Sequence, residues 1–224
     1  MTKHFQRELG KIKKMILSLG AIVEERVRMA GRSMEDWDAE LATRIISTDH
    51  EVDEMEVEIE EECLKILALH QPVAVDLRFI IAVIKINNDL ERIGDQAVNI
   101  AERIETIVRH GTPNETYFNY SDMAAKAERM LKMSLDALVN LDVDLAFKIL
   151  LLDNEVDAIK TEAYDRIKAA LREEDSQQQG LLINLLLISR HIERLADHAT
   201  NIAEEVIYLI EGEIVRHGKV LGAE

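Results

Sequence analysis

Residues 87–102 read Asn-Asn-Asp-Leu-Glu-Arg-Ile-Gly-Asp-Gln-Ala-Val-Asn-Ile-Ala-Glu, and residues 189–204 read Ser-Arg-His-Ile-Glu-Arg-Leu-Ala-Asp-His-Ala-Thr-Asn-Ile-Ala-Glu. The two stretches lie 102 residues apart and share the motif Glu-Arg-x-x-Asp followed by Asn-Ile-Ala-Glu. Helical periodicity alone would make apolar positions recur, but it would not make two charged motifs recur at a fixed spacing. We therefore interpret the chain as two copies of one helical unit.

The composition favours an all-α fold for this chain of 224 residues. Apolar residues make up 47% of it, but aromatic residues only 4%, and there are 2 prolines, as is typical of helical proteins. The formal net charge of −16 disfavours nucleic acid and anionic lipid as direct partners. The N-terminal residues lack the apolar run that is typical of a signal peptide. The longest apolar runs are also much shorter than the ~20 residues that a helix needs to span a bilayer. We therefore expect a soluble protein without membrane insertion, and the single Cys63 fits the cytoplasm.

Apolar residues at helical spacing predict three helical segments in the first half. The first covers Lys3 to about Arg32, and the second runs from Asp38, a candidate N-cap, to His70. Pro72 ends the second segment because proline disfavours helix in the residue before it. The third segment carries an apolar stripe from Phe79 to Ile107.

The second half repeats this plan with helices at Ser121–Asn140, at Val143 to about Glu173, and from Leu181 onward, after a polar connection at Asp175–Gly180. Matched spacing and short connections predict two antiparallel three-helix bundles in tandem, at residues 1–112 and 113–224. The boundary falls at Gly111-Thr112-Pro113-Asn114.

A second apolar set lies off the core stripes of the third and sixth helices. Helices that are apolar on two sides are buried on two sides, so we expect one bundle to pack against the other here. A dimer or partner-docking face is the alternative. The set consists of Leu77, Ile80, Ile81, Ile84, Leu182, Ile183 and Leu186.

Acidic residues recur in pairs four positions apart. Glu91 and Asp95 are neighbours about 6 Å apart along the helix axis, and like charges so placed are destabilising unless a cation lies between them. A helical wheel places them outward, so a solvated charged face is the simplest interpretation. However, the pairs occur in both copies, and the preceding helix of each copy carries a matching pair in the frame Asp-x-Glu-Val-Asp.

If neighbouring helices are antiparallel, four carboxylates converge in each half and form an oxygen-rich cation site. The predicted metal ligands are Asp49, Asp53, Glu91 and Asp95 in the first half, and Asp153, Asp157, Glu193 and Asp197 in the second. Further candidates that would extend the sites are Asn99, Glu102, Asn201 and Glu204, while His191 and His198 would add nitrogen ligands to the second site. Such ligands suit Mg, Ca, Mn or Fe, and Zn is also compatible.

These motifs resemble those of the PhoU family, accessory regulators of bacterial phosphate uptake, over nearly the whole chain. The resemblance also rests on Gln71-Pro72-Val73-Ala74-Val75-Asp76-Leu77-Arg78, before the third helix. It implies two spectrin-repeat-like three-helix bundles whose acidic motifs hold multinuclear metal clusters. Glu56 fits the family pattern after Asp53, whereas Lys160 stands at the counterpart of Glu56.

The resemblance further implies a cytoplasmic negative regulator of phosphate uptake and of phosphate-starvation signalling. Its expected partners are the ATPase subunit of the phosphate ABC transporter and a phosphate-sensing histidine kinase, and we expect a homodimer that reaches the inner membrane only through partners.

Two other classes of protein remain open at this point. A di-metal carboxylate enzyme would carry Glu-x-x-His with its acids facing the core, but no histidine here has Glu three positions before it. Neither a Gly-rich phosphate loop nor a Ser/His/Asp arrangement is apparent, so we expect no enzyme. An inert structural helical module is the third interpretation.

Overall fold

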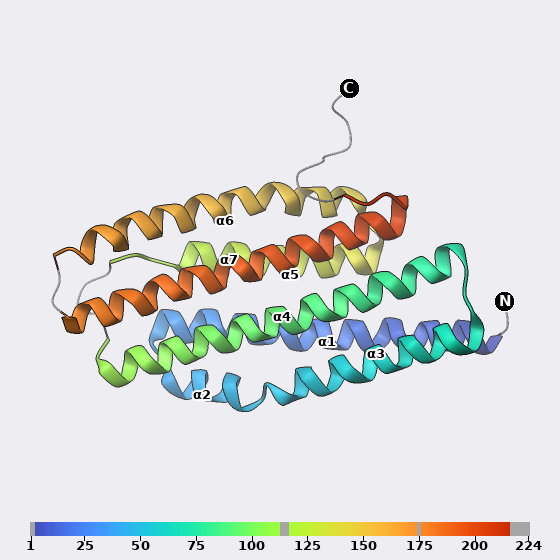
Figure 1. The fold of residues 1–224 in the computed structure, drawn as a ribbon, viewed down its shortest axis with the longest axis horizontal. Coiled ribbons are helices and arrows are strands. Elements are labelled where there is room, and N and C mark those ends of the chain that lie inside the picture. Colours follow the sequence, from blue (N-terminus) through green and yellow to red (C-terminus); the bar gives the residue numbers. More distant parts are fainter. Residues whose placement is uncertain (1–2, 113–116, 174–175, 216–224) are drawn as a thin grey trace, which may run out of the picture.

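The computed structural model describes residues 3–112, 117–173 and 176–215, and these form seven helices (Figure 1). The helices are α1 (Lys3–Asp36), α2 (Ala39–Ser47), α3 (His50–His70), α4 (Ala74–His110), α5 (Ser121–Asn140), α6 (Val143–Ala170) and α7 (Ser176–Glu211). Because α2 and α3 follow each other as one bent rod, each half contains three rods. The predicted all-α fold of two three-helix units is confirmed.

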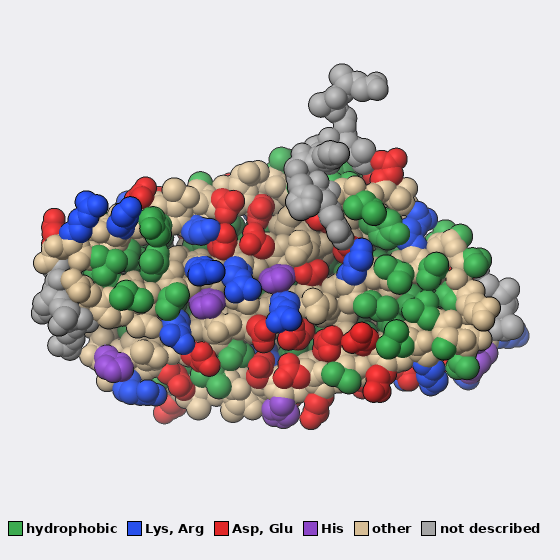
Figure 2. All heavy atoms as spheres, viewed as in Figure 1, with side chains coloured by type: hydrophobic (Ala, Val, Ile, Leu, Met, Phe, Trp, Pro, Cys, Tyr) green, Lys and Arg blue, Asp and Glu red, His purple; other side chains and the backbone are tan. Residues whose placement is uncertain are grey.

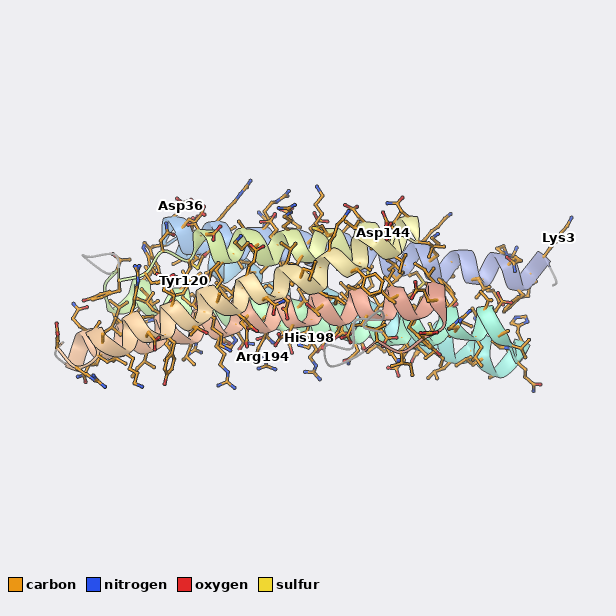
Figure 3. All side chains as sticks on the ribbon, turned by 90° about the horizontal axis from the view of Figure 1, so that it is seen from above. Lys3, Asp36, Tyr120, Asp144, Arg194 and His198 are labelled. Carbon is orange, nitrogen blue, oxygen red and sulfur yellow. The ribbon has the colours of Figure 1, made fainter. Side chains whose placement is uncertain are left out.

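Four long helices lie side by side across one face of the molecule. Figure 1 shows them in the order α6, α7, α4 and α3, with α1 and α5 behind. The view from above in Figure 3 places α1 and α5 on the side opposite the labelled Arg194 and His198 of α7. The two halves meet mainly where α4 packs against α7, and also where α1 packs against α5.

The α4–α7 contact is antiparallel. Lys85 Nζ of α4 lies 2.9 Å from Glu205 Oε1 near the end of α7, whereas Gln96, further along α4, contacts His191 nearer the start of α7. Ile80 and Leu182 are fully buried, as expected for residues between two bundles. The prediction is wrong for two members of that set, because Leu77 and Ile183 remain 39% and 50% exposed.

Several helix ends agree with the sequence prediction. The Asp38 side chain accepts a hydrogen bond from the Leu41 N–H at 3.0 Å and caps α2. α3 ends at His70, where Gln71 adopts a left-handed conformation with φ of 46°. The start of α1 is also as expected, but α1 continues through Gly31 and turns only at Trp37.

The second predicted segment is broken into α2 and α3, and a side chain of α1 binds to the backbone at the break. Arg26, only 3% exposed, donates to the backbone carbonyls of Thr48 and Asp49. At this junction the Glu51 and Val52 N–H groups bond three residues back, to Thr48 and Asp49. Such tighter turns mark helix ends.

Two other boundaries in the second half differ from the prediction. α6 ends at Ala170 rather than near Glu173, and α7 begins at Ser176 rather than at Leu181. Gln has a fairly high helix propensity, so the polarity of residues 176–180 did not predict a loop reliably. Pro113, Asn114 and Asp175 lie outside the described residues. None of the described helices is long and apolar enough to cross a membrane.

Candidate metal-binding faces

The acidic pairs of the first half flank a contact between α3 and α4. A Cβ added at Gly94 of α4 would lie 3.4 Å from Val52 Cγ1 of α3. Val52 stands between Asp49 and Asp53, and Gly94 stands between Glu91 and Asp95, so the close approach brings the two acidic pairs to the same helix–helix seam. α6 and α7 form the equivalent seam in the second half.

We define two surfaces by their residues. The first acidic face consists of Asp49, Asp53, Glu56, Glu91 and Asp95, on α4, on α3 and at the N-cap of α3. The second acidic face consists of Asp153, Asp157, Glu193 and Asp197, on α6 and α7. The helical wheel placed these acids fully outward, but the Glu91 and Glu193 side chains are only 21% and 16% exposed, because the neighbouring helix covers them.

The carboxylates of the first acidic face lie within one another's electric field. Burial raises the pKa of Glu91, and the negative charges of Asp95, Glu56 and Asp53 raise it further. Burial also raises the pKa of Asp49, with added repulsion from Asp53 on its own helix and from Asp95 on α4. This mutual repulsion indicates that the two helices direct their acids toward a common region.

Glu91 carries an unsatisfied atom on this face. Its Oε2 is buried and makes no hydrogen bond, although Arg92 Nε lies 3.4 Å away. A buried carboxylate oxygen without a hydrogen bond is energetically unfavourable, and a bound cation would satisfy it. The donor chemistry of the first acidic face therefore fits a metal ion.

Two arginines partly neutralise the first acidic face. Arg26 Nη1 of α1 lies 3.3 Å from Asp49 Oδ1, and Arg92 Nη1 lies 3.4 Å from Asp95 Oδ2. The sequence prediction missed Arg26. The available signal was its position three residues after Val23 on the apolar stripe of α1, where a charged residue has to find a buried partner.

The second acidic face contains a lysine. Lys160 Nζ forms an ion pair with Glu193, and hydrogen bonding to Glu193 raises the pKa of Lys160. Desolvation, together with the charges of Glu193, Asp153 and Asp157, raises the pKa of Asp197 to about 6. One acid of this face is thus paired within the protein, and another has a pKa only about one unit below neutral pH.

The two histidines of α7 face α4 instead of the second acidic face. His198 Nδ1 lies 2.9 Å from Asp89 Oδ1, and His191 Nδ1 lies 2.9 Å from Gln96 Oε1. The repeat offset of 102 residues carries Asp89 onto His191 and Gln96 onto His198, so the two contacts are counterparts across the α4–α7 contact. We therefore assign these histidines to the interface between the halves.

Of the remaining candidates, Asn201 and Glu204 lie toward the first half, whereas Asn99 and Glu102 make contacts within their own helix. Asn201 Nδ2 donates to Asp89 Oδ1 at 3.1 Å, and Asn99 Nδ2 donates to the backbone carbonyl of Asp95 at 2.8 Å. Glu102 lies beside Arg103, with 3.2 Å between its Oε2 and the Nη2. Glu204 does not extend the second acidic face but lines a hollow of about 630 Å³ between the halves.

That hollow joins residues of the first half to residues of α7. Its lining residues are Glu56, Glu60, Ile84, Lys85, Asn88, Asp89, Asn201, Glu204 and Glu205. Glu56 belongs to the first acidic face, so Asn201 and Glu204 extend toward that face rather than toward the second. The sequence analysis had instead assigned Asn201 and Glu204 to the site in their own half.

Both acidic faces open on the same side of the molecule. Figure 2 shows one group of acidic side chains over α6 and α7, another over α3 and α4, and basic and histidine side chains between them. Burial and the charges of Arg103, Arg194 and Arg190 lower the pKa of His191. Among the described residues, neither face holds three ligand atoms within 4.8 Å of one another.

A tandem of two three-helix units with acidic seams at matching positions defines a class of repeated helical-bundle proteins. The PhoU domain matches the chain twice, over residues 16–104 and 120–206. This chain belongs to the PhoU family, which consists of regulatory proteins and not of enzymes.

Relatives and solved structures agree with this assignment. A phosphate-specific transport system accessory protein PhoU homolog of Pseudomonas aeruginosa is 36% identical over 223 residues, covering 97% of this chain and 89% of that protein. The homolog of Aquifex aeolicus is 37% identical and covers 94% of this chain and 95% of that protein.

Two crystal structures share the fold. PhoU from Pseudomonas aeruginosa superposes with a TM-score of 0.89 at 35% identity, over 93% of this chain and all of that chain (100%). The phosphate transport system regulatory protein PhoU from Streptococcus pneumoniae gives a TM-score of 0.86 at 29% identity, over 95% of this chain and 100% of that chain.

Proposed function

We propose that this protein is a cytoplasmic accessory regulator of phosphate-specific transport that represses phosphate uptake and phosphate-starvation signalling. Support comes from family membership and from the relatives, which are accessory or regulatory proteins of phosphate transport systems. The structural observation that carries the proposal is the presence of two acidic faces on one side of an otherwise apolar-cored scaffold.

The acidic faces are the proposed metal sites. In the first acidic face, Asp49, Asp53, Glu56, Glu91 and Asp95 would hold the ion or ions, and Glu91 Oε2 supports this because it is buried without a hydrogen bond. In the second acidic face Asp153, Asp157 and Asp197 would do so, with Glu193 released from Lys160. A bound Fe, Mn, Mg, Ca or Zn ion would supply positive charge that offsets the repulsion between carboxylates.

The common orientation of the two faces supports docking on one partner surface. The proposed partners are the ATPase subunit of the phosphate ABC transporter and a phosphate-sensing histidine kinase, and the proposed state is a homodimer.

Metal analysis of the purified protein tests the proposed sites. Untagged protein prepared without chelator should contain bound metal, and Asp95→Asn combined with Asp197→Asn should lower the metal content, because each change removes a charged ligand from one acidic face. The matched control combines Asp36→Asn and Asp136→Asn, two exposed acids on α1 and α5. Metal content that is equal in both double variants would remove the assigned sites.

Co-purification tests the proposed partners. The tagged transporter ATPase should retain the wild-type chain, and the control double variant should be retained equally. A sizing measurement on the free protein tests the homodimer. If neither the ATPase nor the kinase retains the wild-type chain, the regulatory adaptor role is wrong, whatever the metal analysis gives.

A further inference from the structure

Three ligating side chains meet at the end of the first half, away from both acidic faces. His4 and Glu8 lie in the first turns of α1, and His70 is the last residue of α3. One ligand atom from each residue lies within 4.8 Å of the other two, and among the described residues this is the one group of three that does so. His4 Nε2 lies 3.2 Å from Glu8 Oε1, and His70 Nε2 lies 2.5 Å from Glu8 Oε2.

The local structure holds two of these ligands in place. The Glu8 and His70 side chains are only 15% and 20% exposed, and the buried ring of Phe5 packs against the His70 ring at a centroid distance of 5.1 Å. His70 is further fixed because α3 stops there, with Gln71 in a left-handed conformation. The third ligand, His4, is 58% exposed and four residues from Glu8, so it can close over an ion from the solvent side.

The simpler interpretation is a carboxylate that accepts hydrogen bonds from two histidines. That interpretation accounts for the contacts. A metal site additionally requires that both rings direct the same kind of nitrogen, Nε2, toward the Glu8 carboxylate, and they do so here. Arg7 Nη2 lies 3.0 Å from His4 Nδ1. An ion on Nε2 requires the ring proton on Nδ1, so the exposed Arg7 side chain has to turn away when an ion binds.

We propose that His4, Glu8 and His70 form a third metal site, for a borderline transition-metal ion such as Zn²⁺. Two imidazole nitrogens and one carboxylate oxygen match the ligand preference of Zn²⁺, Ni²⁺ or Cu²⁺ over Mg²⁺ or Ca²⁺. Three protein ligands at about 2.0–2.2 Å leave a fourth position for water. The ligand atoms need only small rotations to reach such distances, because they already lie within 4.8 Å of one another.

The site would fasten the beginning of α1 to the end of α3. Figure 1 shows both ends at the same end of the molecule as the N-terminus, and Figure 3 labels Lys3 there. The acidic faces offer oxygen ligands from α3, α4, α6 and α7, whereas this site offers nitrogen. The two kinds of site therefore differ in metal preference, and the inference does not rest on the proposed function.

Zinc titration of the full chain tests this site. The protein carries no N-terminal tag, because a tag would add ligands beside His4. It is stripped of metal and titrated with Zn²⁺ against a chromophoric chelator, in excess Mg²⁺ to occupy the oxygen sites. One equivalent of Zn²⁺ should bind to the wild type, and His70→Ala or His4→Ala should weaken that binding at least about tenfold.

His110→Ala is the matched control, because His110 is an exposed histidine at the end of α4 that hydrogen-bonds the Thr106 carbonyl. It should bind Zn²⁺ as the wild type does, and so should Asp95→Asn combined with Asp197→Asn. Circular dichroism checks that each variant is folded, and Zn²⁺ should raise the Tm of the wild type but not that of His70→Gln. Zinc binding that is unchanged in both His4→Ala and His70→Ala, or absent from the wild type, would overturn the proposal.

Discussion

At the scale of single residues, the same charged motif has two different electrostatic states. Glu91 Oε2 is buried without a hydrogen bond and lies 3.4 Å from Arg92 Nε of its own helix, whereas its counterpart Glu193 is paired with Lys160 of the neighbouring helix α6. The difference arises from one position, because Glu56 occupies in the first half the place that Lys160 occupies in the second. A repeated motif therefore does not guarantee two equivalent sites.

The raised pKa of Asp197 predicts a pH dependence of stability. Its pKa is about 6 in the folded protein against an ordinary value of 3.8, so its favourable contribution is fully present below about pH 4 and is lost as the pH rises through 6. Because Asp197 is exposed, we discount the full shift for solvent screening and expect about 1 kcal/mol. In chelator, Asp197→Asn should therefore be more stable than the wild type by this amount near neutral pH.

Urea unfolding at about pH 4.5 and about pH 7.5 measures this difference. The advantage of Asp197→Asn should be small at the lower pH and reach its full size at the higher pH. Asp136→Asn, an exposed change on α5, should show the same difference from the wild type at both values. An Asp197→Asn variant that is equally or less stable at the higher pH would contradict the proposed repulsion on the second acidic face.

At the scale of elements, the bend between α2 and α3 depends on a residue of α1. Arg26 is 3% exposed and donates to the backbone carbonyls of Thr48 and Asp49, and it also pairs with the Asp49 carboxylate at 3.3 Å. The bend sets the direction in which α3 starts. Arg26 thereby positions Asp49, the first residue of the first acidic face.

Arg26→Met should therefore destabilise the protein by about 1–3 kcal/mol, because it removes a buried cation that pairs with the Asp49 carboxylate and adds a second hydrogen bond to the Thr48 and Asp49 carbonyls. The expected loss is measured by urea unfolding. Arg28→Met is the matched control, since Arg28 is half exposed and pairs only with Glu25 on the surface, and it should change stability by less than about 0.5 kcal/mol. Equal effects of the two substitutions would show that Arg26 has no special role.

The sequence predicts what depends on local patterns and misses what depends on neighbouring helices. Asp38 and Pro72 marked helix ends correctly, because capping and proline geometry act within one segment. The contact of Arg26 with the α2–α3 junction could not be predicted, since its partner is 22 residues away in another helix. For His198, a helical wheel gives the direction of the side chain around the axis of α7. It does not tell which helix lies in that direction, and in the structure this helix is α4.

At the scale of the whole molecule, the two halves are joined by antiparallel packing that places both acidic faces on one side. Polar pairs accompany the apolar contact, with Lys85 bound to Glu205 and Asp89 bound to His198. On the opposite side α1 packs on α5, and Gly20 permits the close approach there. A Cβ at Gly20 would lie 2.7 Å from Leu135 Cδ2, so the end of the Leu135 side chain would have to move within the contact.

Gly20→Val should consequently weaken the contact between the halves. Overpacking of a buried site typically costs about 1–3 kcal/mol, and we expect that loss in urea unfolding, within a single transition, because the buried core runs through both halves. Gly10→Val is the control, since Gly10 lies in the same helix with no atom within 4 Å of an added Cβ. It makes the same change in helix propensity, so the difference between the variants isolates the overlap with Leu135. If Gly20→Val is as stable as Gly10→Val, or if the wild type unfolds in two separate steps, α1 and α5 do not couple the two halves.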